Sequence, residues 1–218
     1  MTISRPKEVV RLDKESHRFL VLQRPAYANL SVDESERRLN IEIDRFGEII
    51  KPWLPRKNVR RPVRVVDVGC GIGTSLVALW RHFRQGGRYV ALDKTETARS
   101  IYYGFEAQAA AYNDLGLTTN FLLTAGIKPS LLTTIDVNQS SFPADLGPYD
   151  VVISTISWGF HYPVSTYLQD VVASTLPGAV LYLDLRLGTT GEDDLKPYFE
   201  LLWSASGRKQ FSGVWRRR

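Results

Sequence analysis

Cysteine is nearly absent from this chain. Cys70 is the single cysteine among 218 residues, so one molecule cannot form an internal disulfide, which fits a reducing compartment. Long apolar stretches are also absent, and the longest runs have the length of a strand rather than the roughly 20 residues of a membrane-spanning helix. The start of the chain is polar and of mixed charge, unlike a secretory signal peptide. We therefore expect a cytoplasmic protein without a membrane span.

Positive charge is concentrated at the two ends of the sequence. The net charge is +5, but residues 1–64 carry +6, residues 65–207 carry −6 and the last eleven residues carry +5. Basic stretches at residues 56–61 and 216–218 are able to contact nucleic acid, anionic lipid or an acidic substrate. A solvated linker and a solvated terminus explain them more simply. We therefore rank nucleic acid below a small-molecule or glycan acceptor as the partner.

The first 62 residues differ from the rest and predict a helical N-terminal cap. Ser31 is a predicted N-cap, and Glu34 stands three residues later, as in a capping box. Apolar residues then recur at positions that favour an amphipathic helix, namely Leu39, Ile41, Ile43, Phe46, Ile49 and Ile50. Three prolines between residues 52 and 62 end this helix. The sequence thus divides into a cap, residues 1–62, and a main domain, residues 63–218.

Short β-rich runs alternate with helical stretches from residue 63 onward, an order that predicts βαβ units and a parallel sheet. Predicted strands cover residues 63–68, 88–92, 131–135, 149–155 and 179–185. Predicted helices cover residues 74–84, 95–115 and 165–174. Two further runs, residues 198–204 and 209–216, are spaced as an antiparallel pair at the end of the sheet. The predicted fold class is therefore α/β.

The loop after the first predicted strand carries the strongest functional signal. Residues 67–73 read Asp-Val-Gly-Cys-Gly-Ile-Gly and lead into a predicted helix. In open α/β sheets, ligands bind outside the carboxyl ends of the strands, and glycines there allow a ligand to approach the backbone. The spacing does not fit the Gly-x-Gly-x-x-Gly dinucleotide fingerprint, and no Gly-Lys-Ser/Thr of a phosphate-binding P-loop follows. The spacing therefore excludes both of these nucleotide-binding motifs.

This run resembles motif I of the class I S-adenosylmethionine (SAM)-dependent methyltransferases. The resemblance implies a Rossmann-like α/β sandwich with a mostly parallel seven-stranded sheet, an antiparallel C-terminal strand and a helical N-terminal cap. It implies SAM as cofactor and S-adenosylhomocysteine (SAH) as product, with the glycines under the methionine part and Asp67 holding its α-amino group. The residues that we expect to contact the cofactor are Asp67, Gly69, Cys70, Gly71, Gly73, Asp93, Lys94, Asp136, Val137 and Ser154.

Acidic residues at the ends of the second and third predicted strands support this interpretation. Asp93 follows the glycine loop by about 20 residues, where Rossmann-like sites place a carboxylate against the ribose hydroxyls, and a carboxylate can accept from both hydroxyls. In the resembled family, an acidic residue after the third strand accepts from the adenine amino group, and the next apolar residue lies against the ring. Asp136 and Val137 stand at those positions.

The segment after the fourth predicted strand is expected beside the transferred methyl group. His161 is the candidate catalytic residue, because methyl transfer to a hydroxyl requires removal of a proton and a neutral histidine accepts one near physiological pH. Trp158 and Tyr162 are candidates for contacting the acceptor. Packing of the loop explains the aromatic residues at least as well, and a structural role for His161 stays open.

A wider set of residues resembles a narrower group, the bacterial putative sugar O-methyltransferases. It comprises residues 93–94, 103–105, 112–113, 158–163 and 183–186. This resemblance implies a hydroxyl of a small polar or sugar-containing acceptor as the methylated group, with Tyr103 and Arg186 as further contacts. The alternatives are a place in the core for Tyr103 and an ion pair with Asp184 for Arg186.

Two other functions stay open, and no metal is expected. A nucleic-acid methyltransferase of the same fold would use the basic termini, but residues 154–157 lack the Asn/Asp-Pro-Pro-Tyr type of sequence found in base amino-methyltransferases. A SAM-binding partner subunit without catalysis would not depend on His161. Asp136, Asp184 and His161 would have to converge to hold a divalent ion, and no short ligand motif supports that arrangement.

Overall fold

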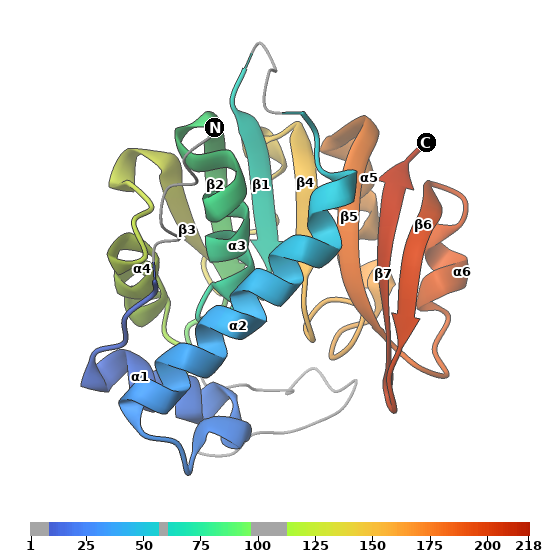
Figure 1. Ribbon diagram of the computed structural model, residues 1–218. Helices are drawn as coiled ribbons and strands as arrows, with labels where there is room; N and C mark the ends of the chain where they lie inside the picture. The colour runs from blue at the N-terminus through green and yellow to red at the C-terminus, as the bar shows by residue number, and fades with distance from the viewer. Residues whose placement is uncertain (1–8, 57–60, 97–112) are drawn as a thin grey trace, which may run out of the picture.

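The computed structural model describes residues 9–56, 61–96 and 113–218. Within these ranges a seven-stranded sheet has the strand order β3-β2-β1-β4-β5-β7-β6 (Figure 1). The strands are β1 (Val63–Val68), β2 (Gly87–Asp93), β3 (Leu132–Asp136), β4 (Tyr149–Ser154), β5 (Thr175–Arg186), β6 (Phe199–Ser206) and β7 (Gln210–Arg217). All seven predicted strands are confirmed, with ends that differ from the prediction by a few residues.

The directions of the strands confirm the predicted sheet. Strands β1 to β5 pair in parallel, and β7 runs antiparallel to both of its neighbours, β5 and β6. The last strand of the chain is thus inserted within the sheet rather than added at its edge. Burial explains this position, because Val214 and Trp215 of β7 are buried on opposite faces and such a strand needs cover on both sides.

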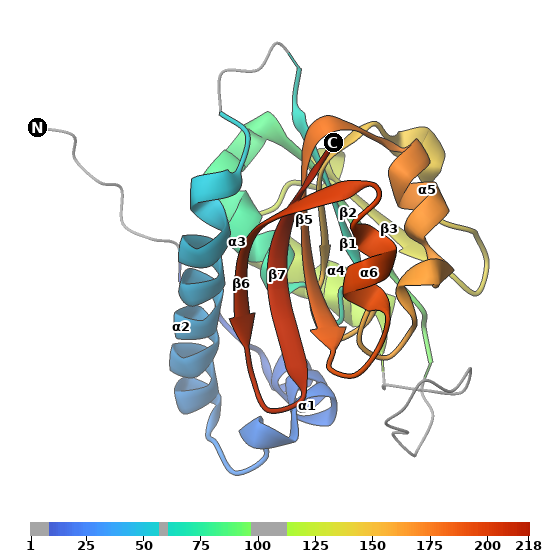
Figure 2. The ribbon, with the colours of Figure 1, turned by 90° about the vertical axis from the view of Figure 1, so that its right-hand side faces the viewer.

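Alternate residues of the central strands fill two separate cores, as the period of a strand requires. One face is covered by α1 (Lys14–Gln23), α2 (Val32–Ile50), α3 (Thr74–Phe83) and α4 (Leu115–Thr124), and the other by α5 (Leu168–Ala173) and α6 (Gly191–Leu195) (Figure 2). No helix in the described residues has the length and apolar character needed to cross a membrane. The described part of the chain is therefore a three-layer sandwich.

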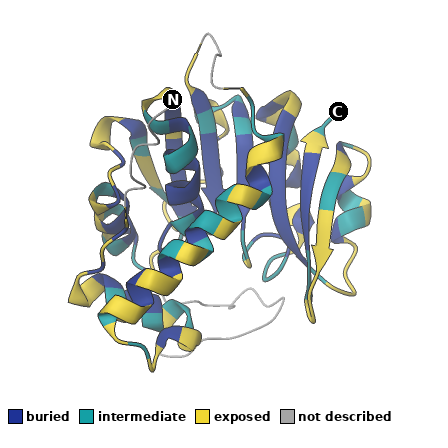
Figure 3. Cartoon of the chain, viewed as in Figure 1, coloured by how far each residue is buried: buried dark blue, intermediate teal, exposed yellow. Residues whose placement is uncertain are grey.

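Helix α2 crosses one face of the sheet obliquely and confirms the predicted amphipathic helix (Figures 1 and 3). It begins with the predicted capping box, in which the Ser31 amide donates to Glu34 Oε2 at 2.8 Å and the Glu34 amide donates to Ser31 Oγ at 3.3 Å. Leu39 and Ile43 are buried against the sheet, whereas Ile41 is 66% exposed. The helix thus presents one apolar face to the core, as the sequence predicts.

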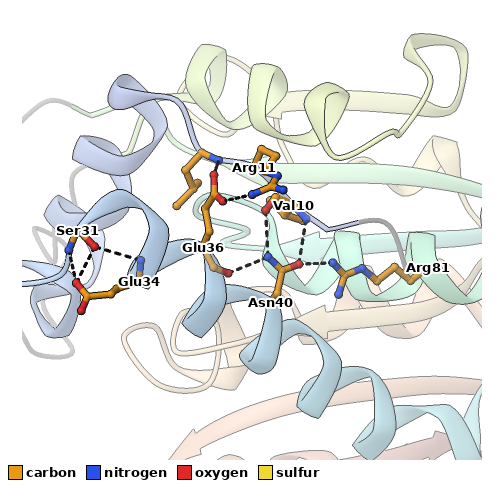
Figure 4. Close-up of polar contacts among 8 residues, drawn as sticks. Val10, Arg11, Ser31, Glu34, Glu36, Asn40 and Arg81 are labelled. Atoms are coloured by element: carbon orange, nitrogen blue, oxygen red, sulfur yellow. Dashed lines mark hydrogen bonds and ion pairs between the residues drawn. The ribbon is translucent and has the colours of Figure 1, made fainter. Parts of the chain in front are cut away.

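Polar contacts fasten the cap to the main domain (Figure 4). The Asn40 side chain of α2 accepts from the Val10 amide at 3.0 Å and from Arg81 Nη2 of α3 at 2.6 Å. Glu36, one turn earlier, accepts from the Leu12 amide at 2.7 Å. These bonds hold the segment before α1 against α2, and α2 against α3. The boundary at residue 62 stays a prediction, since the cap and the sheet share one core.

The prediction of a helix over residues 95–115 is wrong at both of its described ends. Glu96 and Asn113 instead form an antiparallel β-bridge, with hydrogen bonds of 2.9 Å in each direction. Helix α4 begins only at Leu115, where the Asp114 side chain caps it through the amides of residues 116 and 117. Sequence analysis missed α4, because its threonines and its glycine are poor helix formers and tertiary packing decides its structure.

Candidate functional site

The glycine loop connects β1 to α3 in a conformation that requires glycine. Gly69, Gly71 and Gly73 have φ angles of 71°, 53° and 91°, in the left-handed region that other residues avoid. A Cβ on Gly69 would collide with the Ser157 side chain, which follows β4. The loop is fixed to the neighbouring strand, because the Gly69 amide donates to the Leu92 carbonyl at 2.7 Å. Two strand ends therefore meet at this loop without room for an added side chain.

A cavity of about 590 Å³ opens at these carboxyl ends, where β1, β2 and β4 are adjacent in the sheet. Seven of the predicted site residues line it, namely Gly69, Cys70, Gly71, Asp93, Lys94, His161 and Tyr162. The opposite wall belongs to the cap, which contributes Gln23, Arg24, Tyr27, Arg38, Glu42, Ile43 and Phe46. A volume of this size suits a small ligand enclosed between two parts of the chain.

Asp93 stands at the end of β2 and faces the cavity. Its Oδ2 accepts from the Gly71 amide at 2.8 Å, and its Oδ1 accepts from the Lys94 amide at 2.7 Å. Loss of hydration raises the pKa of this carboxyl to about 6, although the two amide bonds and the charge of Lys94 act in the opposite direction. Asp93 therefore presents a carboxylate, already oriented by backbone, to whatever enters the cavity at neutral pH.

Asp67 lies behind the glycine loop rather than in the cavity. It is fully buried, and its Oδ2 accepts a short hydrogen bond from the Ser75 hydroxyl of α3. Its Oδ1 has no hydrogen-bond partner among the described residues. Burial raises the pKa of Asp67 to about 7. Ser75 lines the cavity, so the predicted contact between Asp67 and a ligand would have to pass beside this hydroxyl.

The loop after β4 is organised around one carbonyl group. The Ser157 carbonyl accepts from the amides of Phe160, His161 and Tyr162 at 3.0, 2.7 and 3.1 Å. Just before it, Ile156 has a φ angle of 55°, which is strained for a β-branched residue. Ile156 is 48% exposed and lines the cavity. Backbone strain beside a cavity is typical of functional sites.

His161 lines the cavity from this loop, and its surroundings favour the neutral imidazole. Burial lowers the pKa of His161, and the positive charge of Arg186 lowers it further. Arg186 itself does not line the cavity, and its guanidinium lies 5.8 Å from the centroid of the Phe160 ring. The structure thus places Arg186 as an electrostatic neighbour of His161 rather than at the cavity wall.

Lys94 and Tyr162 form a second polar pair on the cavity wall. Lys94 Nζ lies 2.5 Å from Glu96 Oε2. Burial lowers the pKa of Lys94, but the hydrogen bonds and charges of Glu96 and Tyr162 outweigh burial, so the net shift is upward. The ammonium group is therefore stabilised in its charged form beside the Tyr162 hydroxyl.

Solved structures with a similar fold include methyltransferases. The O-methyltransferase TomG from Streptomyces achromogenes, solved in complex with SAM, has a TM-score of 0.53 at 13% identity, over 96% of this chain and 91% of that chain. Precorrin-6y C5,15-methyltransferase from Geobacter metallireducens also scores 0.53, at 13% identity over 79% of this chain and 87% of that chain. This chain has the class I SAM-dependent methyltransferase fold.

A third structure with this fold is TrmN from Thermus thermophilus, with a TM-score of 0.53 at 16% identity. It covers 79% of this chain, which spans only 48% of TrmN. No protein-family model matches the sequence, and no curated protein matches it. The methyltransferase fold is therefore recognised from structure. At these sequence identities, the acceptor of one protein does not indicate the acceptor of another.

Several predicted site residues of this methyltransferase fold lie outside the cavity. Ser154 Oγ is fully buried and links β1 to the loop, donating to the Val68 carbonyl at 2.7 Å and accepting from the Trp158 amide at 2.8 Å. The Trp158 ring has 0% exposure, and its indole N–H donates to the Val164 carbonyl at 2.8 Å. Both residues pack the loop, which is the alternative that the sequence left open for the aromatic residue.

The remaining predicted residues lie close to the cavity or outside the described ranges. Asp136 pairs opposite Asp93 on the neighbouring strand, and its Oδ1 accepts from the Asn138 amide at 2.9 Å. The amide of Val137 donates to the Asp93 carbonyl at 2.9 Å. Gly73 is the N-cap of α3, and an added Cβ there would meet Leu122. Tyr103 lies outside the described residues.

The predicted site residues include neither the cap residues nor Asn113, although residues 112–113 belong to the set that resembles the sugar O-methyltransferases. Gln23 Oε1 accepts from the Ile72 amide at 3.0 Å, and Gln23 Nε2 donates to Asn113 Oδ1 at 2.8 Å. Asn113 is buried and donates to the Lys94 carbonyl at 3.0 Å. No motif marks Gln23, because its contact with Asn113 joins segments 90 residues apart. Only the tertiary fold brings them to the glycine loop.

Acidic and histidine side chains do not gather into a metal centre in the described part of the chain. No group of three or more His, Cys, Asp or Glu residues there is arranged to hold an ion. Asp184, a candidate that the sequence raised, accepts instead from the Ser212 hydroxyl at 2.5 Å. The expectation that the protein works without a metal stays a prediction.

Proposed function

We propose that this protein is a SAM-dependent methyltransferase that transfers a methyl group to a hydroxyl of a small polar or sugar-containing acceptor. The observation that carries the proposal is the position of Asp93. Its carboxylate is held 2.8 Å from the Gly71 amide and lines the same cavity as His161 and Tyr162. A cofactor bound at the carboxyl ends of the strands would thus lie next to His161 and Tyr162, which are candidate groups for acid–base chemistry.

The residues present fit the parts of SAM. The Asp93 carboxylate has further lone pairs for two ribose hydroxyls beyond the two amides that it accepts from. The glycine loop leaves backbone exposed where the methionine part would lie. The orphaned Oδ1 of Asp67 is a buried acceptor that suits an ammonium group. Asp136 and Val137, one strand further along the sheet, remain the proposed adenine contacts.

Bound SAM would supply a methyl group on a sulfonium, a strong leaving group. Transfer of that methyl group to a hydroxyl would release SAH as the leaving group and would require the hydroxyl to lose its proton. We assign that proton to His161, because its lowered pKa keeps the imidazole neutral and able to accept it. Tyr162 and Lys94 would orient the hydroxyl. The remaining work of the chain is to align the two reactants.

The cavity wall supplied by the cap fits an acceptor with a ring. Phe46 of the cap and Ile156 of the loop after β4 offer apolar surface, and His161 and Tyr162 offer polar groups on the same cavity. Sugars and hydroxylated rings combine an apolar face with hydroxyls at the edge. The apolar face would contact the apolar side chains of the cavity, and the hydroxyls would contact its polar groups. The preference for a sugar rests on the sequence resemblance.

Two measurements test this proposal. Calorimetry with SAM and SAH should show binding of each. An absence of binding would contradict the proposal that the protein uses SAM. A radiolabelled methyl assay should then give label in glycans or hydroxylated small molecules, with total RNA as the competing acceptor. Label found only in RNA would favour a nucleic-acid methyltransferase, and binding without transfer to any acceptor would favour a non-catalytic partner subunit.

A further inference from the structure

Arg24 lies where the cap meets the glycine loop. It directly follows α1, and its Nη2 donates to Thr74 Oγ1 at 3.0 Å. Thr74 is the first residue of α3 and follows the glycine loop directly. Arg24, Thr74 and Gly71 all line the cavity. A guanidinium from the N-terminal part of the chain thus reaches the part of the cavity where the methionine end of SAM would lie.

Arg24 shares the carboxylate that it contacts with a second arginine. Glu42 on α2 is shared by two arginines, since Arg24 Nη1 donates to its Oε2 at 2.9 Å and Arg38 Nε donates to its Oε1 at 3.0 Å. One carboxylate therefore faces two guanidiniums. Arg38 is held within the cap by a further bond to the Ala26 carbonyl at 3.1 Å and lies over the Tyr27 ring. Arg24 is the arginine of the pair that also contacts the main domain.

The free donors of this region point to an anion. The two bonds of Arg24 use two of the five N–H groups of a guanidinium. The adjoining start of α3 has neither a side-chain cap nor an acidic residue in its first turn, so its first amides and its dipole also favour negative charge. The fully buried Asp67 carboxyl lies behind the same helix start and has one oxygen without a partner among the described residues. An anion paired with a nearby ammonium group, as in an amino acid, matches this combination.

We propose that Arg24 binds the carboxylate of the methionine part of SAM and SAH. This inference rests on the proposed function, because it takes the cavity to be a SAM site. It adds a cofactor-binding residue that lies outside the main domain and outside every motif in the sequence. It also gives the cap a role in holding the cofactor, in addition to covering the acceptor.

Calorimetry with SAM and decarboxylated SAM tests this assignment, because the two ligands differ only in the carboxylate. We expect the wild-type protein to bind SAM at least about tenfold more tightly than decarboxylated SAM. Arg24→Gln should raise the Kd for SAM by about tenfold to a hundredfold. It should leave the Kd for decarboxylated SAM within about twofold of the wild-type value. The matched control is Arg45→Gln, because Arg45 is an exposed cap arginine on α2 that does not line the cavity. It should leave both affinities unchanged.

Arg24→Lys covers the case in which Arg24→Gln does not fold. Lysine keeps the charge but loses the planar fork, so the preference for SAM over decarboxylated SAM should shrink by about threefold or more. Equal weakening of both ligands in the Arg24 variants, or a wild type that does not discriminate between them, would overturn the assignment. A wild type that binds neither ligand nor SAH would instead refute the proposed function, so the two failures are distinguishable.

Discussion

The two sides of the cavity are built in different ways. On the strand side, backbone groups fix the site, as where the Gly71 amide binds Asp93 and the Gly69 amide binds the Leu92 carbonyl. On the cap side, side chains make the contacts, as where Gln23 accepts from the Ile72 amide and Arg24 contacts both Glu42 and Thr74. The strand side is set by short-range geometry, and the cap side depends on how two helices dock.

Backbone contacts and side-chain contacts differ in how well they survive changes of sequence. Backbone contacts survive most substitutions, so the strand side can persist at the 13% identity shared with TomG. Side-chain contacts change with each residue, so the cap side can differ between chains of one fold. We therefore expect the cofactor chemistry to depend mainly on the strand side and the choice of acceptor mainly on the cap and the loop after β4.

The substitution Gly69→Ala should have the largest effect, because it disturbs two loops of the strand side at once. Its Cβ would collide with Ser157 in the loop that carries His161, at a φ angle of 71°. Strain and overpacking together should lower the free energy of unfolding by about 2–6 kcal/mol and abolish SAH binding. Chemical denaturation and calorimetry measure the two effects. Gly86→Ala is the control, since an added Cβ there meets no atom within 4 Å; an equal loss in both variants would contradict the prediction.

The substitution His161→Gln should lower the turnover rate and leave the affinity for the cofactor unchanged. Loss of a general base costs about 10²–10⁴ in rate, whereas the strand side, where we propose that SAM binds, is untouched. Steady-state kinetics should show the fall in kcat, and calorimetry should give an SAH affinity within about twofold of wild type. If kcat is unchanged, His161 is structural, and the acid–base role has to be sought in Tyr162 and Lys94.

The substitution Asp93→Asn should weaken binding of the cofactor and leave binding of the acceptor nearly unchanged. Loss of charge-assisted hydrogen bonds to the ribose should raise the Kd for SAH by about tenfold to a hundredfold. The acceptor KM at saturating SAM should change by less than about threefold. Asp193→Asn is the matched control, because Asp193 pairs with Lys196 on an exposed surface, where ion pairs contribute little. Unaltered SAH binding by Asp93→Asn would remove the ribose contact from the proposal.

Acid should produce the smallest effect and sharpen the same assignment. The folded-state pKa of Asp93 is about 6 against an ordinary 3.8, so the carboxyl takes up its proton as pH falls through 6. SAH affinity should then drop, by about tenfold at pH 5 if the ionised form alone binds. The stability of the free protein should change in the opposite sense, because the folded state binds this proton more readily than the unfolded state between pH 6 and 4. Calorimetry between pH 5 and 7.5 checks the affinity, and its pH dependence should shrink in Asp93→Asn.

Much of the strand side could be predicted from the sequence. The run Val63–Val68 holds four valines, which favour strands, and leads into a loop with three glycines, and the structure begins and ends β1 at the predicted residues. Asp93 is predicted from its place at the end of the next strand, about 20 residues after the glycine loop, and the structure places it on the cavity wall. Such inferences need only the period of a strand and the residues next to it.

The cap side could not be predicted in the same way. Nothing local to Gln23 or Arg24 marks them as site residues, because their partners Ile72 and Thr74 lie about 50 residues away in the sequence. Trp158 shows the opposite failure, since an aromatic residue in a loop beside the site is fully buried and bonded to Val164. Sequence shows which residues are apolar or polar, and tertiary docking decides which of them face the cavity.

Gln23 ties three distant parts of the chain together, through the Ile72 amide, the Asn113 side chain and, beyond it, the Lys94 carbonyl. Ligand occupancy and docking of α1 are therefore coupled equilibria, because a ligand that needs this wall binds only the docked form. A ligand present at 100 times its Kd would add about 2.7 kcal/mol to the free energy of detaching the cap. Hydrogen exchange at the α1 amides would then slow as the ligand concentration rises, so the exchange rate would report the fraction of protein that has ligand bound.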